Sequence, residues 1–327
     1  MRFHKIVLTG LTVVASLGMA SEAVAGGRTA GSLLLYPEFD NRVGDVSVLT
    51  ITNVDSANSV DVEFVYIGRF GSGTSQVNCA EFNREETLTP NDTLTLLTNA
   101  HNPQMEQGFV YAFAREGVAN PVKHDGLIGN IMTFQGFASI EYSINAVSYK
   151  AGEGVNGGTD VNDNGLRDLD GTEYEMAANE LQIPRFFGQG AVFSSDLILI
   201  GLSGGSKFNT TVDFLIYNDN EEVFSSEHTF YCWDRIPLTE ASGVVTNNFL
   251  MNGTNHDLTE YLGVNIESGW MRITGAVASS TAITIPNPAI YAVLIERIGS
   301  YGGADLPFEE GTNPNGKLLA RSVNGDF

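Results

Sequence analysis

The densest cluster of potential metal ligands in this chain is the segment GTDVNDNGLRDLDGTEYE, residues 158–175. Oxygen-bearing side chains stand at alternate positions, as Asp160, Asn162 and Asn164, and Gly165 follows where a tight loop needs a sharp bend. Ca²⁺ takes about six to eight oxygen ligands from carboxylates, amide oxygens and backbone carbonyls. Because a tight loop turns alternate side chains toward one point, this spacing predicts a calcium site.

The remaining predicted ligands follow the bend. We expect the carbonyl of Leu166 and the carboxylates of Asp168, Asp170 and Glu173 to complete the coordination shell. The spacing fits the first part of an EF-hand loop, but Gly171 occupies the position where that loop has its bidentate acid. The alternative is a flexible acidic linker without metal, which the preceding glycine-rich residues favour.

The D-x-N-x-N-G-x-x-D string at residues 160–168 resembles the calcium loops of thrombospondin type 3 repeats and related short loops of secreted bacterial proteins. Such loops bind calcium without a complete flanking helix pair. The resemblance covers residues 160–175 only, and it implies a bound calcium ion but nothing about the rest of the fold.

No motif in the chain predicts catalysis. The pattern GLSGG (201–205) places Ser203 in a G-x-S-x-G string, but a nucleophile elbow needs a helix after the turn, and the following residues have the pattern of a strand. We therefore expect a glycine-rich hairpin turn there. The four histidines beyond residue 25 have no metal-ligand spacing, and we expect them at the surface. They are His101, His124, His228 and His256.

The two tryptophans bear on a glycan-binding alternative, since exposed aromatic rings stack on sugars. Trp270 is expected in the core, because the internal repeat described below pairs it with Phe109. Trp233 adjoins Cys232 and precedes charged residues, so we expect it to be exposed.

Apolar side chains recur at every second position along most of the chain. In the segment 60–66, Val60, Val62 and Phe64 alternate with acidic residues, and the segment 109–113 has an aromatic residue at every second position. Short segments of this kind, bounded by Gly, Asn, Asp and Ser, are typical of half-buried antiparallel strands. The sequence predicts an all-β protein, with one short helix over residues 173–181.

A weak internal repeat relates the two halves of the chain. Residues 45–68 align with residues 196–219, which places Val62 opposite Val212 and Phe64 opposite Phe214. Three further matches follow in the same order: Cys79 with Cys232, 108–113 with 269–274, and 143–149 with 289–295. A chance alignment of amphipathic strands is the alternative.

The repeat predicts two tandem immunoglobulin-like β-sandwich domains, residues 30–150 and 182–300. The acidic segment 151–181 would join them, with calcium fixing the joint, and residues 301–327 would form a C-terminal tail. Outside the calcium loop, the chain resembles uncharacterised secreted bacterial β-sandwich proteins. The apolar segment from Leu33 is expected to be the first strand of its own domain; the alternative is a strand donated to a neighbouring molecule.

The N-terminus predicts export. Arg2 and Lys5 precede an apolar stretch that ends in Ala23-Val24-Ala25, so we expect a signal peptide over residues 1–25 with cleavage after Ala25, and no transmembrane anchor. In an exported chain, Cys79 and Cys232 are expected to form a disulfide.

The net charge of −22 excludes nucleic acid as a partner, because phosphate binding needs a basic surface. We expect a secreted, non-enzymatic structural, adhesive or assembly protein of the cell surface or extracellular space, with the periplasm as another location. Its partners would be other proteins or copies of itself. The alternatives are a glycan-binding module and a hydrolase with an unidentified site.

Overall fold

The computed structural model describes residues 29–70, 77–117, 120–137, 139–152, 158–190, 192–205, 207–218, 221–251 and 267–318. The predicted signal peptide and His256 lie outside these residues. The described chain is nearly all β, as the alternating sequence pattern predicts, and every pairing between its strands is antiparallel. No helix among these residues has the length and apolar character needed to cross a membrane.

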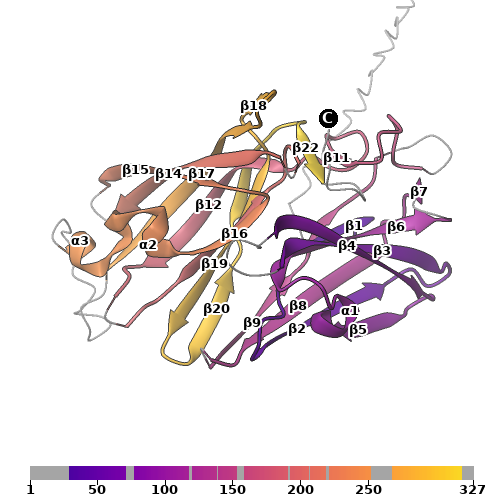
Figure 1. Ribbon diagram of the computed structural model, residues 1–327, viewed down its shortest axis with the longest axis horizontal. Helices are drawn as coiled ribbons and strands as arrows, with labels where there is room; N and C mark the ends of the chain where they lie inside the picture. Colours follow the sequence, from indigo (N-terminus) through magenta and orange to yellow (C-terminus); the bar gives the residue numbers. More distant parts are fainter. Residues whose placement is uncertain are drawn as a thin grey trace, which may run out of the picture.

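The first half of the chain builds two sheets (Figure 1). Sheet I has the strand order β10 (Val147–Tyr149), β1 (Leu33–Asp40), β6 (Gln107–Glu116), β3 (Val60–Phe70), β4 (Val77–Leu88), with β7 (Asn120–Pro121) beside β6. Sheet II has the order β5 (Thr93–Leu97), β2 (Asp45–Asn53), β8 (Leu127–Gln135), β9 (Ile140–Asn145). A single helical turn, α1 (Thr98–His101), follows β5.

The second half of the chain builds two further sheets. Sheet III has the order β15 (Val223–Phe230), β14 (Asn209–Asn218), β17 (Ser268–Ser279), β12 (Ala178–Phe187), β21 (Phe308–Thr312), with β18 (Thr284–Pro286) beside β17. Sheet IV has the order β16 (Trp233–Pro237), β13 (Asp196–Gly201), β19 (Ile290–Ile298), β20 (Tyr301–Asp305). Short helical segments follow β16: α2 (Leu238–Ala241), a 3₁₀ turn (Gly243–Val245) and α3 (Asn247–Met251).

The same strand order recurs in both halves. Sheet III repeats sheet I with β12 in the place of β1, β17 in the place of β6 and β14 in the place of β3, and sheet IV repeats sheet II in the same way. Even an irregularity recurs: the register shifts between Tyr36 and Phe39 in β1 and between Ile183 and Phe186 in β12, with a proline inside each shift. The alignment of 108–113 with 269–274 agrees with this order, because these residues open β6 and β17.

Two predicted matches are wrong, and the first concerns two strands. Residues 143–149 end β9 and form β10, whereas residues 289–295 belong to β19, whose counterpart by position is β8. Both segments alternate in the same way, so the sequence pattern does not distinguish the strands.

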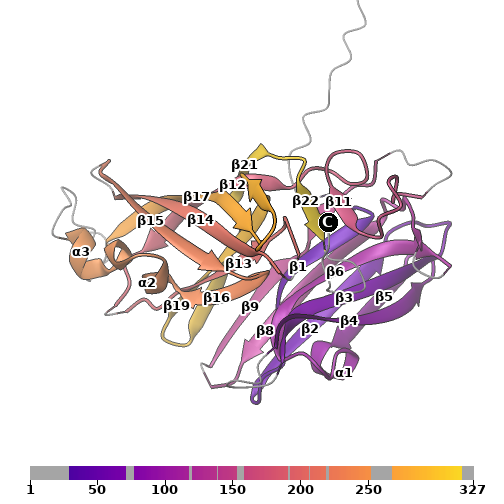
Figure 2. The same ribbon diagram turned by 45° about the horizontal axis from the view of Figure 1, so that its top comes forward.

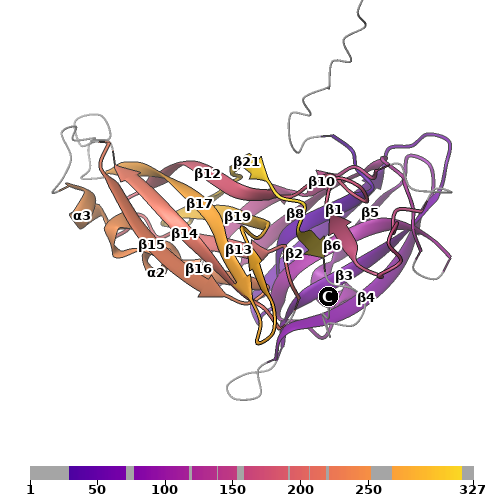
Figure 3. The same cartoon turned by 90° about the horizontal axis from the view of Figure 1, so that it is seen from above.

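The hydrophobic core continues across the two halves. Along β13, Leu197 and Leu199 pack in the core of the second half, whereas Ile198 and Ile200 pack in the core of the first half. The residues of β19 alternate between the two cores in the same way, and β1 contacts both β13 and β19. The sheets therefore follow one another in the order III, IV, I, II, and the halves lie side by side (Figure 3).

This arrangement suggests four blades of a propeller, and it does not establish two immunoglobulin-like domains. Strand β1 is buried along its whole length between β10 and β6 of its own chain, as expected of a first strand of its own domain rather than a donated strand.

Four details of the predicted organisation are wrong. Residues 173–181 form no helix: an isolated bridge at Tyr174 is followed by β12, which begins at Ala178. The boundary at residue 182 therefore falls inside a strand. The predicted tail contains β20, β21 and β22 (Gly316–Leu318), which complete sheets. The GLSGG segment is not a hairpin turn, since β13 and β14 lie in different sheets.

The predicted disulfide between Cys79 and Cys232 is present. The two cysteines are not equivalent by position, however. Cys79 lies near the start of β4, whereas Cys232 lies between β15 and β16. The bridge joins the two halves directly.

Candidate functional site

The acidic segment has the turn geometry that its spacing predicts. The backbone N–H of Asn164 donates to Oδ1 of Asp160 and to Oδ1 of Asn162, each over 3.1 Å, and the N–H of Gly165 donates to the other oxygen of Asp160 over 3.0 Å. Gly165 has φ of +75°, the conformation for which the sequence provides a glycine. These bonds close the first half of the loop around the side chain of Asp160.

Glu173 closes the second half of the loop. Its Oε1 accepts a hydrogen bond from the backbone N–H of Val161 over 2.9 Å, so its side chain reaches back to the start of the loop although Gly171 holds the expected position of the acid. Burial raises the pKa of Glu173; the N–H of Asp168 opposes this, and the charges of Asp168 and Asp160 raise it further. Three carboxylates therefore lie within electrostatic reach of one another.

The other predicted ligands are engaged in contacts within the protein. Oδ2 of Asp168 accepts hydrogen bonds from the amide nitrogens of Asn162, over 2.7 Å, and Asn164, over 3.3 Å. Its Oδ1 lies 3.7 Å from Nζ of Lys317. Asp170 instead accepts from backbone N–H groups of its own turn. Across the described ranges, no three Asp, Glu, His or Cys side chains converge as a ready-made metal site.

The loop is packed against both halves and is not a loose linker. Strand β11 (Arg167–Leu169) pairs with β22, beside the junction (Figure 2). The guanidinium of Arg167 lies over the ring of Phe113, 4.9 Å from its centroid, and Leu169 is fully buried. On the other side, the N–H of Lys317 donates to the carbonyl of Leu202 in the second half.

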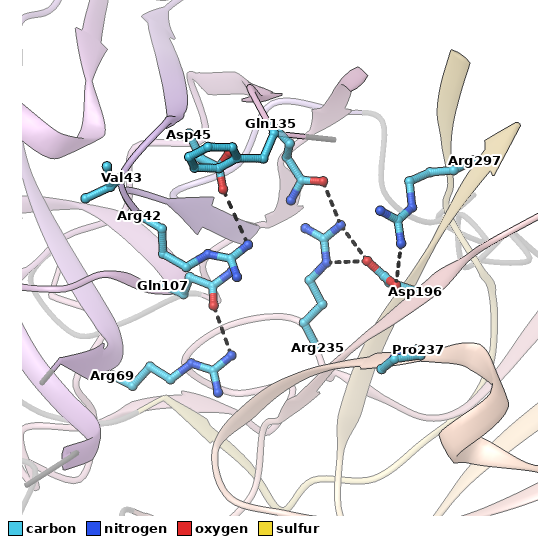
Figure 4. A pocket seen from close by; sticks show the side chains of 11 residues that line it. Arg42, Val43, Asp45, Arg69, Gln107, Gln135, Asp196, Arg235, Pro237 and Arg297 are labelled. Atoms are coloured by element: carbon cyan, nitrogen blue, oxygen red, sulfur yellow. Dashed lines mark hydrogen bonds and ion pairs between the residues drawn. The ribbon is translucent and has the colours of Figure 1, made fainter. Parts of the chain in front are cut away.

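A second candidate site is a cavity of about 510 Å³ between the two halves (Figure 4). Its charged lining residues are Arg42, Arg69, Arg235, Arg297, Asp45 and Asp196. Arg42 lies between β1 and β2, Arg69 near the end of β3, Arg235 on β16 and Arg297 near the end of β19. The sequence gives no sign of this cluster, because its members are far apart in the chain and none forms a motif.

A buried carboxylate organises one wall of the cavity. Asp40 is fully buried and accepts hydrogen bonds from Nε and Nη2 of Arg42, over 2.9 and 2.6 Å. It also accepts from the amide nitrogens of Gln107, over 2.9 Å, and Gln135, over 3.4 Å. This fixes the orientation of both amides, whose oxygens then accept from Arg69 and Arg235 (Figure 4).

Arg235 connects the two halves through this wall. Its guanidinium donates to Glu38 of β1 and to Asp196 of β13, and it also contacts the hydroxyl of Tyr142. Burial lowers the pKa of Arg235, but the charges of Glu38 and Asp196 and the hydrogen bond to Glu38 outweigh it, so the net pKa is raised and the side chain stays charged. Asp196 also pairs with Arg297, 3.0 Å away.

The remaining candidates have structural contacts. Ser203 is 4 % exposed, and its Oγ donates to Asn315 and accepts from the N–H of Ala289, so it is not presented as a nucleophile. His101 is not a surface residue: its Nδ1 lies 2.8 Å from the hydroxyl of Tyr66, and burial lowers its pKa.

His124 is only partly exposed, with Nε2 bonded to Asn53, and burial lowers its pKa. His228 lies 3.6 Å from Asp234 and is also partly buried.

The expectations for the two tryptophans are reversed. Trp233 is buried, and its indole N–H donates to the carbonyl of Pro37 across the junction of the halves. Trp270 lies half-buried on the outer face of sheet III, where its ring stacks on that of Tyr217 with centroids 4.2 Å apart. Sequence reasoning misassigned Trp270, because the corresponding Phe109 faces the core.

Comparison with known proteins does not identify a family. No family model matches the chain, and no curated protein matches it significantly. The structure has weak similarity to a chain in the cryo-EM structure of Broad Bean Stain Virus, with 10 % identity, a TM-score of 0.17, and coverage of 95 % of this chain and 99 % of that chain. A protein from Parabacteroides distasonis ATCC 8503 gives 8 % identity, a TM-score of 0.16, and coverage of 82 % and 74 %.

Proposed function

We propose that this chain is an exported, non-enzymatic structural, adhesive or assembly protein whose acidic loop binds calcium. In this proposal residues 1–25 are a signal peptide, and each half is immunoglobulin-like in the broad sense of two antiparallel sheets facing one another. The disulfide between Cys79 and Cys232 supports an oxidising location, outside the cell or in the periplasm.

The position of Glu173 carries the calcium proposal. In an EF-hand the last acid of the loop closes the coordination shell. We propose that Glu173 takes the role of that acid from two positions later; its Oε1 accepts the N–H of Val161, which brings the carboxylate to the start of the loop. Burial raises the pKa of Glu173, and the charges of Asp168 and Asp160 add to this rise; a bound cation would offset that repulsion.

Calcium would act here on the joint between the halves. The loop leads into β11, which pairs with β22, and the residues around β22 contact the second half. The continuous core already fixes the halves relative to one another, so calcium would stabilise this packing rather than set the angle of a hinge. Asp160, Asn162, Asn164 and Asp168 are the proposed side-chain ligands with Glu173, together with the carbonyl of Leu166; Asp170 would act by shaping its turn.

Calorimetry of calcium binding to the chelator-treated, full-length protein tests the proposal. We expect saturable heat and a raised Tm with Ca²⁺, and affinity lower by about tenfold or more in Asp160→Asn and Glu173→Gln. Asp163→Asn is the matched control, because Asp163 is an exposed acid of the same loop, with φ of +55°, and asparagine tolerates this conformation. Absence of both heat and Tm shift in the unaltered protein would refute the calcium site.

Size-exclusion chromatography with and without calcium tests the assembly role separately. Multimers that form with calcium and dissociate on chelation would support assembly. A calcium-bound protein that stays monomeric at every concentration would contradict self-assembly without affecting the metal site.

Glycan binding is a second candidate function, favoured by the stacked pair of Trp270 and Tyr217 on an outer sheet face. We expect Trp270→Ala to abolish retention on a glycan column if this face binds sugar. Tyr301→Ala, which removes an aromatic ring that is 77 % exposed elsewhere, is the control. Equal retention of the two variants would exclude the face as the site.

A further inference from the structure

We propose that the cavity between the two halves binds the carboxylate of a small organic acid that also has a non-polar body. The volume of about 510 Å³ is in the range of small-molecule sites. Four guanidinium groups line it in a chain with 17 basic and 39 acidic residues. Guanidinium groups bind carboxylates through paired N–H donors, which gives this lining its chemical preference.

Ion pairs account for three of the four arginines. Arg235 and Arg297 share Asp196 within the second half, and Arg235 also pairs with Glu38 across the junction. Arg42 pairs with Asp40 and Asp45 within the first half. The fourth arginine needs a separate account.

Arg69 is the arginine that the ion pairs do not explain. Among the described residues no carboxylate lies within ion-pair distance of it; its Nη2 donates to Oε1 of Gln107 over 3.0 Å. Its guanidinium lies over the buried ring of Trp233, 5.4 Å from the centroid. Since Asp40 fixes Gln107 in turn, Arg69 is held in place while most of its N–H donors are not used within the described part of the protein.

Arg42 lines the same cavity. Hydrogen bonding to Asp40 raises the pKa of Arg42, and burial opposes this rise. The side chain of Arg42 is 48 % exposed, so it is accessible to a ligand that enters from solvent.

The mouth of the cavity is non-polar. Val43 and Phe137 both line it and are 90 % and 85 % exposed. Two such side chains beside the guanidinium of Arg69, which has no carboxylate partner among the described residues, fit a ligand with a carboxylate at one end and an apolar group at the other. A bare inorganic anion would leave them in water.

Fluorescence of Trp233 gives a direct readout, because this ring lies under Arg69. In a Trp270→Phe background only Trp233 emits from tryptophan. Titration of the full protein at low salt with benzoate, with its neutral isostere benzamide, and with inorganic phosphate separates charge from shape. We expect saturable change with benzoate, none with benzamide, and weaker binding of phosphate.

Two variants locate the site. Arg69→Gln should weaken benzoate binding about tenfold or more, and Phe137→Ser, at an exposed position, should weaken it several-fold without affecting the fold. Arg84→Gln removes the same charge from β4, outside the cavity lining, and should bind like the unaltered protein. Equal responses to benzoate and benzamide, or an unchanged benzoate affinity in both Arg69→Gln and Phe137→Ser, would overturn the proposal. Phosphate binding as tightly as benzoate would overturn the requirement for a non-polar body.

Discussion

Nη1 of Arg235 lies 2.5 Å from Oε1 of Glu38, which is 197 positions earlier in the chain, and both side chains are buried. Glu38 lies on β1 and Arg235 on β16, so this pair crosses the junction between the halves. The hydroxyl of Tyr142 donates to the same carboxylate. The disulfide and the indole of Trp233 cross the same junction, so β16 and its preceding turn supply three side-chain links between the halves, beside the continuous core.

Removal of Arg235 is expected to destabilise the protein strongly. Arg235→Met leaves the carboxylate of Glu38 buried without its cation, at a cost of about 3–5 kcal/mol in the free energy of unfolding. The double variant Glu38→Gln, Arg235→Met should recover part of this loss, because no unpaired charge then remains. Urea denaturation measures both, with Arg272→Met as the control, since Arg272 pairs with Glu180 on an outer face and should cost about 1 kcal/mol or less. Similar costs for Arg235→Met and Arg272→Met would contradict this account.

The disulfide is expected to stabilise the packing of the halves as well as the chain as a whole. Cys79 and Cys232 are separated by 153 positions, so the bond closes a long loop of the unfolded chain. Cys79→Ser with Cys232→Ser should lower the free energy of unfolding by about 2–5 kcal/mol. Denaturation of the unaltered protein with and without reductant should reproduce this difference, and an unchanged midpoint would show that the bond adds nothing to stability.

Ser203 is expected to contribute to stability and not to catalysis. Ser203→Ala removes a buried hydroxyl that links Asn315 to the N–H of Ala289, at a cost of about 1–2 kcal/mol. Ser225→Ala, at an exposed position of β15, is the control and should be near neutral. Generic ester substrates should be hydrolysed at the background rate by all three proteins. Turnover by the unaltered protein that Ser203→Ala abolishes would establish the hydrolase alternative.

The sequence predicted an all-β chain and part of the internal repeat, because alternation along a strand is a local property. Val62 and Phe64 face the core, and so do their matched residues Val212 and Phe214. The sequence did not predict how the sheets stack. Four consecutive residues of the six in β13 have buried side chains, which is typical of a sheet covered on both faces. A short apolar run is equally typical of a buried strand in many other folds.

The two candidate sites also differ in whether the sequence reveals them. The acidic loop could be found from sequence, because its residues lie within one turn-rich segment. The contact of Glu173 with the start of the loop depends on how the chain folds back after Gly171. From the sequence alone, a glycine at position 171 in place of the acid indicated an incomplete set of ligands. The cavity arginines are brought together by strand pairing over long distances, so Arg69 and Arg235 have no common signal in the sequence.

The pH dependence of stability should reveal the repulsion in the acidic loop. Burial, together with the charges of Asp168 and Asp160, raises the pKa of Glu173 in the folded protein above its usual value. The folded state then binds this proton more readily than the unfolded state, so the contribution of Glu173 to stability is lost as the pH rises from its ordinary pKa through the raised one. At neutral pH without calcium, the ionised carboxylate opposes folding, and bound calcium would remove this cost.

Urea denaturation in chelator from about pH 5 to 8 measures this contribution when Glu173→Gln is compared with the unaltered protein. The difference in unfolding free energy should shift in favour of Glu173→Gln with rising pH, by about 1 kcal/mol for each unit by which the pKa is raised. Glu141→Gln removes the same charge at an exposed position and should give no such trend. Saturating calcium should abolish the trend in the unaltered protein, because a bound cation keeps Glu173 ionised in the folded state over the same pH range. A trend that persists unchanged in calcium would show that the carboxylate of Glu173 does not take part in metal binding.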